Sequence, residues 1–268
     1  MKSTLIIDRT GEIRQNHFGT PMKIISYRNC DDIDVEFQDE HHFIVKHATY
    51  NNFKLGGITN PYDITVYGVG YFGEGKYKSS YEKGVVYQGY KTWADMLKRC
   101  YRTKYKDMYP SYHKIATVCD EWHCYQVFAE WYENNKYNVE ERLHLDKDIL
   151  IPGNKIYSPE TCILVPQRIN LLFMNKSNSQ GLPNGIRKMK SGCYSVHYSH
   201  LKIGNYKTFE EAANAYCIAK ENAIKDIADE YKNIIPTKLY DALNNYKVDI
   251  TLDKNCIRQG NRNSIENI

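Results

Sequence analysis

The chain has 268 residues, with 36 Lys or Arg against 32 Asp or Glu, and its formal net charge is +4. Its composition, 42% hydrophobic and 25% charged, excludes a disordered chain and allows two or three domains. No apolar run approaches membrane-spanning length, and the N-terminal one is too short for a signal peptide, so we expect a cytoplasmic protein with no membrane partner.

The eight cysteines lack the paired spacing of a zinc ribbon, and we interpret them as buried free thiols. A zinc site is the alternative. It would use Cys100, Cys119, His123 and Cys124, but a second closely spaced cysteine pair is missing.

Residues 1–70 are predicted to form a small all-β domain, resembling a barrel of about five short strands. Ile33, Val35 and Phe37 alternate with polar residues, as expected for strands with one buried face. Nothing in this segment indicates catalysis. The glycine-rich segment 66–90 is predicted to be a linker, because it lacks the Gly-Lys-Ser/Thr sequence of a phosphate-binding loop.

From residue 88 the pattern becomes helical. Trp93, Met96, Leu97 and Cys100 form an apolar stripe, and a second aromatic stripe follows over residues 122–132. Both stripes are predicted to be core. Basic residues lie beside the first stripe and are candidates for contact with a phosphate backbone: Lys98, Arg99 and Arg102.

Residues 143–170 are predicted to form a strand, a Gly-Asn loop, a strand and a short helix. His144, Asp146 and Asp148 are spaced by two, so in a strand they share one face. Asn170 on the helix adds another polar ligand candidate. This layout is typical of a small ββα metal site that cuts phosphodiesters.

Residues 185–206 are predicted to form three short strands, followed by a capping box at Thr208 and Glu211 that opens a long helix. A last helix is predicted over 238–246. Residues 185–207 contain five basic residues and no acid, which suits nucleic-acid binding, although a solvated surface has the same composition. The DNA-contact candidates of this segment are Arg187, Lys188, Lys190, Tyr194, His197 and Lys202.

Several of these motifs together resemble a known family. YKTWADMLKRCY at 90–101, VCDEW at 118–122, LDKD at 145–148, YSPETC at 157–162 and VPQ at 165–167 resemble phage-type HNH endonucleases, which include free-standing homing endonucleases. Residues 185–231 resemble the AP2-type DNA-binding domain. The resemblance implies an α+β chain with an HNH-like nuclease domain over 85–176 and an AP2-like domain over 183–250. It covers about 85–250 and leaves residues 1–70 outside.

The resemblance also implies roles for individual residues. Asp146 takes the position of the metal-ligating aspartate and Asn170 that of the ligand on the helix, and Mg²⁺ or Mn²⁺ suits such oxygen donors. Two departures stand out. Lys147 occupies the position of the general-base histidine, and Thr161 replaces the usual loop asparagine.

The base that activates water therefore stays open between two residues. A lysine amine is a poor base near neutral pH unless burial or positive neighbours intervene. His144 is the natural substitute, because histidine titrates near neutrality. Asp148 is either a further metal ligand or the group that orients His144, and Lys147 can instead contact the phosphate.

The expected function is that of a DNA endonuclease, encoded by a phage and acting in the host cytoplasm as a monomer on double-stranded DNA. In the C-terminal domain the sheet would lie in the major groove, with Arg187 reading guanine and the lysines contacting phosphate. The first alternative is a catalytically inactive DNA-binding protein or regulator, which the two departures favour. The second is a protein-interaction module.

Overall fold

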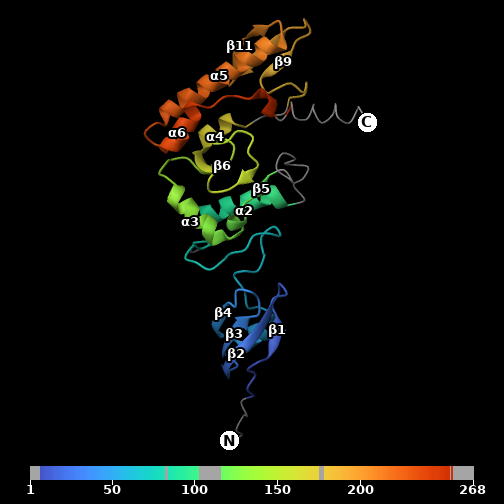
Figure 1. Ribbon diagram of the computed structural model, residues 1–268, viewed down its shortest axis with the longest axis vertical. Helices are drawn as coiled ribbons and strands as arrows, with labels where there is room; N and C mark the ends of the chain where they lie inside the picture. The colour runs from blue at the N-terminus through green and yellow to red at the C-terminus, as the bar shows by residue number, and fades with distance from the viewer. Residues whose placement is uncertain (1–6, 82–83, 103–115, 175–177, 254, 256–268) are drawn as a thin grey trace, which may run out of the picture. The chain divides into compact units, whose positions relative to one another are not determined.

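The computed structural model describes residues 7–81, 84–102, 116–174, 178–253 and 255, and its fold class is α+β (Figure 1). The chain divides into two compact units. Residues 1–102 and 120–130 form the first, and residues 103–119 and 131–268 form the second.

The N-terminal segment forms an open antiparallel sheet rather than the predicted all-β barrel. Its strand order is β1-β2-β3-β4, so in the described residues β1 and β4 are edges that do not close on each other. A helix, α1 (Tyr50–Leu55), covers the core through Phe53, and it begins at a Thr49 side chain that accepts from the Asn52 amide. The strands are β1 (Ile13–Gln15), β2 (Pro21–Asn29), β3 (Asp32–Phe37) and β4 (Ile44–Ala48).

The glycine-rich segment packs within the first unit and is not the linker predicted. A Cβ at Gly70 would lie 2.5 Å from Cδ1 of Leu97, and one at Gly75 would lie 2.3 Å from Oε1 of Gln126. The buried Gln126 side chain also pairs with both backbone groups of Tyr77, at 3.0 Å and 2.9 Å. The glycines are needed because this backbone approaches neighbouring side chains closely.

Aromatic side chains fill the core beside this segment, as the apolar stripes predicted. They come from α2 (Gln88–Tyr101), the 3-10 helix η3 (Asp120–His123) and the start of α3 (Tyr125–Asn135). Trp93 donates from Nε1 to the carbonyl oxygen of Trp122 at 2.7 Å, and its ring lies 5.4 Å from that of Tyr125.

A ββα unit lies in the second unit of the chain. Strand β6 (Leu143–Asp146) pairs antiparallel with β8 (Ile163–Pro166), and helix α4 (Gln167–Leu172) follows at once. A further short strand lies between them in sequence, because β7 (Ile156–Tyr157) pairs in parallel with β5 (Thr117–Val118). The prediction of a strand, a loop, a strand and a helix is thus confirmed. The chain between the two paired strands contributes β7 to a second two-stranded sheet.

The C-terminal elements follow the prediction closely. Strands β9 (Ile186–Lys188), β10 (Tyr194–Tyr198) and β11 (Leu201–Tyr206) form an antiparallel sheet in the order β11-β10-β9. The capping box of Thr208 and Glu211 opens helix α5 (Phe209–Glu230). Helix α6 (Thr237–Asn244) and the 3-10 helix η4 (Ile250–Leu252) complete the fold.

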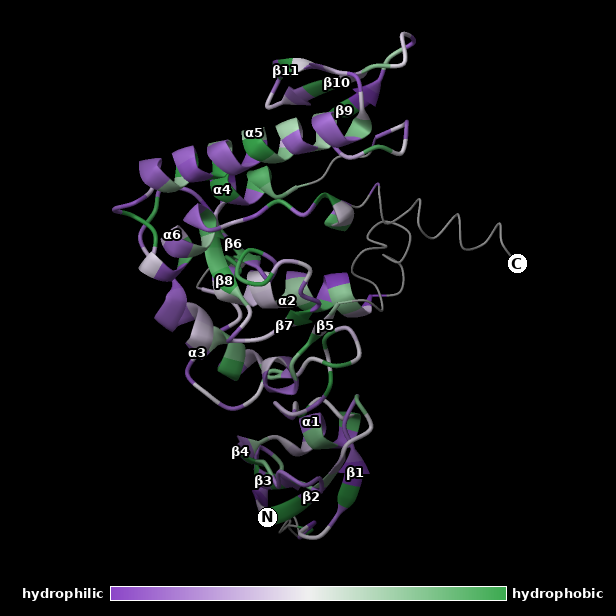
Figure 2. Cartoon of the chain, turned by 45° about the horizontal axis from the view of Figure 1, so that its top comes forward, coloured by the Kyte–Doolittle hydropathy of each residue, from purple (hydrophilic) through white to green (hydrophobic). Residues whose placement is uncertain are grey.

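Helix α5 belongs to two cores at once. Its N-terminal half covers the three-stranded sheet through Ala212 and Tyr216. Its C-terminal half packs through Ile224, Ile227 and Ala228 into the core that contains β8, α4 and α6. Figure 2 shows the helix running from the sheet to α4 and α6. The two modules predicted as separate domains are therefore joined by one continuous 22-residue helix.

Candidate functional site

His144 and Asn170 meet across the ββα unit. The Asn170 Nδ2 atom lies 3.2 Å from Nδ1 of His144, so β6 and α4 bring together two of the predicted site residues. Alternation in β6 buries Leu143 and Leu145, and it turns His144 and Asp146 to the opposite, partly exposed face. The shared strand face predicted from the sequence is confirmed for His144 and Asp146, whereas Asp148 lies beyond the end of β6.

Asp146 ends β6 and caps the turn that follows it. Its Oδ1 atom accepts from the backbone amides of Asp148 and Ile149, at 2.7 Å and 2.8 Å. Although part of the Asp146 side chain is exposed, desolvation by the surrounding residues raises the pKa of its carboxyl above the usual range, and the neighbouring Asp148 charge raises this pKa further, against the two amide hydrogen bonds. A cation beside the carboxylate would offset this unfavourable charge.

The raised pKa of Asp146 predicts a pH-dependent effect of replacing it with asparagine. The pKa of Asp146 is higher in the folded chain than in the unfolded chain, so protonation of this carboxyl stabilises the fold. That contribution is fully present below the unfolded-state pKa and is lost as pH rises through the folded-state pKa. Asp146→Asn keeps an Oδ1 acceptor without the charge, so it should raise the Tm at pH 7. Thermal unfolding from pH 7 down to pH 4 should show this gain in Tm shrinking. A constant gain would contradict the raised pKa of Asp146.

Lys147, which the HNH resemblance would place at the general-base position, is buried at 7% exposure. Its Nζ atom donates to both carboxylate oxygens of Asp148, at 2.7 Å and 2.8 Å, and to the carbonyl oxygen of Asn154 at 2.6 Å. Three acceptors around one nitrogen match the three protons of an ammonium group. This arrangement favours a structural role for Lys147 as a cation over the role of a base. It also occupies both carboxylate oxygens of Asp148, which was predicted to be a metal ligand or to orient His144.

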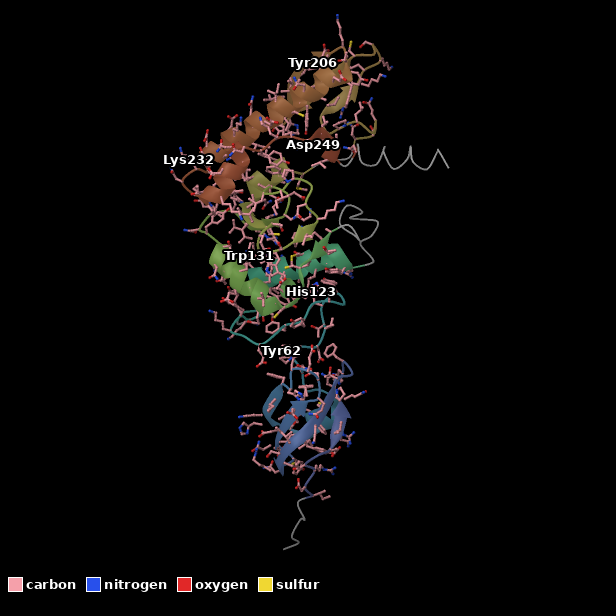
Figure 3. The ribbon with its side chains drawn as sticks, in the orientation of Figure 1. Tyr62, His123, Trp131, Tyr206, Lys232 and Asp249 are labelled. Atoms are coloured by element: carbon pink, nitrogen blue, oxygen red, sulfur yellow. The ribbon has the colours of Figure 1, made fainter. Side chains whose placement is uncertain are left out.

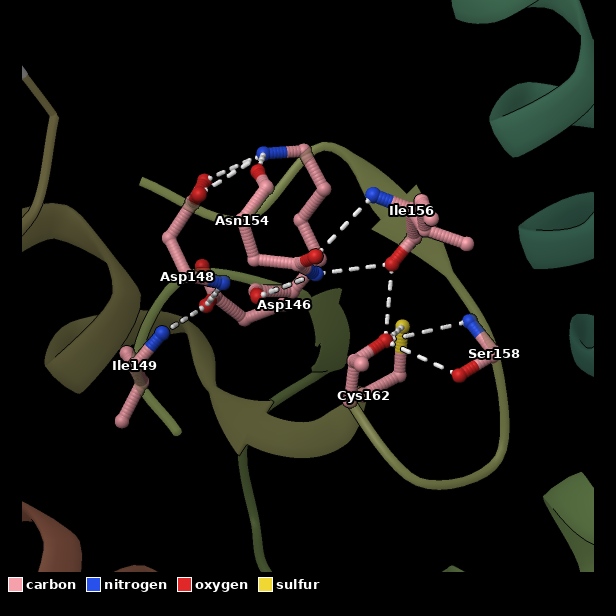
Figure 4. Close-up of polar contacts among 9 residues, drawn as sticks. Asp146, Asp148, Ile149, Asn154, Ile156, Ser158 and Cys162 are labelled. Atoms are coloured by element: carbon pink, nitrogen blue, oxygen red, sulfur yellow. Dashed lines mark hydrogen bonds and ion pairs between the residues drawn. The ribbon is translucent and has the colours of Figure 1, made fainter. Parts of the chain in front are cut away.

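The loop after β6 is held by side chains that bond to its backbone, as Figure 4 shows. The Asn154 amide donates to the carbonyl oxygens of Lys147 and Ile156, at 3.0 Å and 2.7 Å. The Thr161 hydroxyl donates to the Ile156 carbonyl at 2.7 Å. Beside it, burial raises the pKa of the Cys162 thiol to about 12. The Asn154 side chain therefore holds the loop backbone in place. Its position after Gly153 in the sequence indicated only that a turn forms here.

Two side chains near β6, Asp146 and Asn170, could each offer one oxygen to a divalent cation. Both amide bonds to Asp146 reach Oδ1, which leaves Oδ2 for a further partner, and the contact through Nδ2 of Asn170 leaves its carbonyl oxygen. If the amide is turned so that this oxygen accepts from Nδ1–H of His144, one of its two lone pairs orients the imidazole and the other stays available to a cation. The two roles of Asn170 use the same oxygen.

One other group of possible ligands occurs among the described residues, in the first unit: Asp32, Asp34 and His47. The Arg28 guanidinium already bonds both carboxylates, at 2.7 Å to Asp32 and 2.5 Å to Asp34. These bonds lower the pKa of each carboxyl to about 2. The group is therefore an ion-pair cluster in which the Arg28 guanidinium already engages both carboxylates.

The C-terminal sheet divides the predicted DNA contacts between its two faces. Ile186 and Val196 are fully buried toward α5, so the residue after Ile186, Arg187, projects from the open face. Tyr194 packs toward α5, with Phe209 at 5.9 Å between ring centroids, and the Lys188 Nζ lies 5.9 Å from the Tyr194 ring. Tyr206, labelled in Figure 3, packs on that side as well.

Strand alternation therefore assigns Lys188 and Tyr194 to the helix side of the sheet, and Arg187, His197 and Lys202 to its open side. Lys190 lies in the exposed turn between β9 and β10. Asn205 also belongs to the open side, and the sequence did not single it out.

Lys98 and Arg99 lie in the last turn of α2, and Arg102 is its C-cap residue. All three side chains are half-buried, and Arg99 donates from Nε to the Asp95 carbonyl at 3.1 Å. Cations at a helix C-terminus are stabilised by the helix dipole, which gives these residues a structural role besides the predicted DNA contact.

Comparison with known proteins found no matching family model, no significantly similar curated protein and no significantly similar solved structure. Within the described ranges, no helix has the length and apolar character needed to cross a membrane.

Proposed function

We propose that this chain is a metal-dependent DNA endonuclease of the HNH, ββα-metal class, of the phage homing type. The contact between His144 and Asn170 across β6 and α4 is the observation that supports it most. A second support is the shared helix α5, which places a basic sheet and the ββα unit on one rigid element.

In this proposal His144 is the general base that takes a proton from the attacking water at Nε2, while its Nδ1–H donates to the side-chain oxygen of Asn170. Asp146 and Asn170 are the residues that would hold Mg²⁺ or Mn²⁺, which when bound polarises the scissile phosphate and stabilises the leaving oxygen. Lys147 supplies no lone pair. Its ammonium group holds Asp148 and the Asn154 carbonyl in place, and so fixes the loop that follows Asp146.

Supercoiled plasmid and phage DNA, incubated with and without Mg²⁺ or Mn²⁺, test the activity. We expect nicked or linear products only with the ion present. Intact DNA under every condition, together with retained DNA binding, would instead support the alternative function of a DNA-binding protein without catalysis. The observation that favours this alternative is the use of Lys147 as a structural cation at the base position.

Salt dependence of DNA affinity provides a separate prediction. If about three basic residues of the sheet contact phosphates, affinity should fall about 40-fold between 50 and 200 mM salt, since each contact adds about −0.9 to the logarithmic slope. Fluorescence anisotropy with labelled duplex at several salt concentrations measures it. A flat titration, or no binding, would favour a protein-interaction module.

A further inference from the structure

The open face of the C-terminal sheet carries a row of three polar residues in register. Arg187 of β9 pairs with Ser195 of β10, and Ser195 pairs with Asn205 of β11. Neighbouring strands lie about 4.8 Å apart, so the backbones of Arg187 and Asn205 are about 10 Å apart. Both outer side chains are exposed, whereas Ser195 between them is small and buried.

The next row is displaced by an irregularity in the strand pairing. Val196 pairs with Gly204 but His197 pairs with Lys202, which leaves Ile203 as an extra residue in β11. The Ser195 hydroxyl lies 3.4 Å from Nδ1 of His197, which confirms that these two side chains share the open face. His197 and Lys202 therefore continue the polar surface beyond the Arg187–Ser195–Asn205 row.

We propose that Asn205 is a base-reading residue of this sheet and that it recognises adenine, while Arg187 at the other end of the row recognises guanine. The inference rests on the proposed DNA-binding function. An asparagine amide pairs bidentately with N6 and N7 of adenine in the major groove, and a guanidinium pairs with O6 and N7 of guanine. Ser195 between them has a short side chain that does not project beyond Arg187 and Asn205.

The positive charge of this face suits the negative charge of duplex DNA. Its residues divide into candidates for contact with bases and candidates for contact with phosphates. Residues 185–207 contain no acidic side chain, so nothing on these strands repels phosphate. Lys190 and Lys202 are exposed and suit the backbone, because a lysine acts as a point charge without a planar fork. With about 10 Å between the two backbone positions and about 3.4 Å per base step, the guanine and adenine are expected about three base pairs apart.

Selection of bound duplexes from a randomised library, with the full chain, tests the assignment. We expect a site with a guanine and an adenine within about three base pairs. Asn205→Ala should reduce the preference for adenine at one position about ten-fold or more, without changing the guanine. Arg187→Ala should do the converse. Asn205→Gln, which keeps the amide but shifts its reach, should alter the same position as Asn205→Ala.

Lys202→Ala is the matched control on the same strand. It should weaken all sequences equally and reduce the salt slope by about one, since it removes only a phosphate contact. Salt-dependent binding with unchanged sequence preference in folded Asn205→Ala and Asn205→Gln would overturn the reading role of Asn205 alone. Absence of any duplex binding by the unsubstituted chain would overturn the proposed function as well.

Discussion

If His144 is the general base of the proposed endonuclease, replacing it with alanine is expected to lower the rate of DNA cleavage by about 10²- to 10⁴-fold, which is the usual contribution of such a group. DNA affinity should change little, because the proposal assigns DNA binding to the exposed basic residues of the sheet. The ring of His144 lies against Asn170 on a partly exposed strand face, so its removal leaves the cores of the unit intact. Single-turnover cleavage and duplex binding, measured on the same preparation, check both expectations.

Lys147→Arg separates the two candidate bases. Arginine keeps a positive donor beside Asp148 and the Asn154 carbonyl, but it is not deprotonated in proteins and so cannot act as a base. We expect cleavage to persist in Lys147→Arg and to be lost in His144→Ala, with both variants folded at the assay temperature. The opposite pattern would assign the base to Lys147, and loss in neither would remove both residues from the chemistry.

Replacing Gly185 with alanine is expected to destabilise the C-terminal module by about 3 kcal/mol or more. A Cβ there would lie 2.3 Å from the carbonyl oxygen of His197 and 2.8 Å from Cε2 of Tyr216. The backbone of Gly185 also has φ +84° and accepts from the His197 amide at 2.8 Å, so it cannot move away without breaking the sheet. Urea unfolding of the full chain measures the loss.

Gly192→Ala is the matched control for this substitution. Gly192 has nearly the same φ, +87°, but nothing lies within 4 Å of an added Cβ. It should cost only about 1–2 kcal/mol, the penalty of a left-handed conformation. The difference between the two variants isolates the close contact at Gly185, and equal losses would show that the contact contributes nothing. Because α5 joins both cores, Gly185→Ala should also lower cleavage.

Local sequence determined the elements of the second unit. The capping box at Thr208, the two-residue alternation around His144 and the three short strands all depend on neighbours within a few positions. Interactions of this range leave a readable period or cap in the sequence, which is why these predictions are confirmed. Helix α1, which the all-β prediction lacked, has local cap residues as well, Thr49 before it and Gly56 after it.

Which side chains contact one another depends on the tertiary structure and could not be predicted from local sequence. Whether Lys147 is a base or a structural cation depends on Asp148 and on Asn154, seven residues away on a turn whose path no local pattern specifies. Likewise, the assignment of Tyr194 to the helix and of Asn205 to the open face follows from strand register, including one irregularity at Val196. Composition and periodicity determine that a strand or helix forms, whereas register and long-range packing decide what each of its residues touches, and the chemistry depends on those contacts.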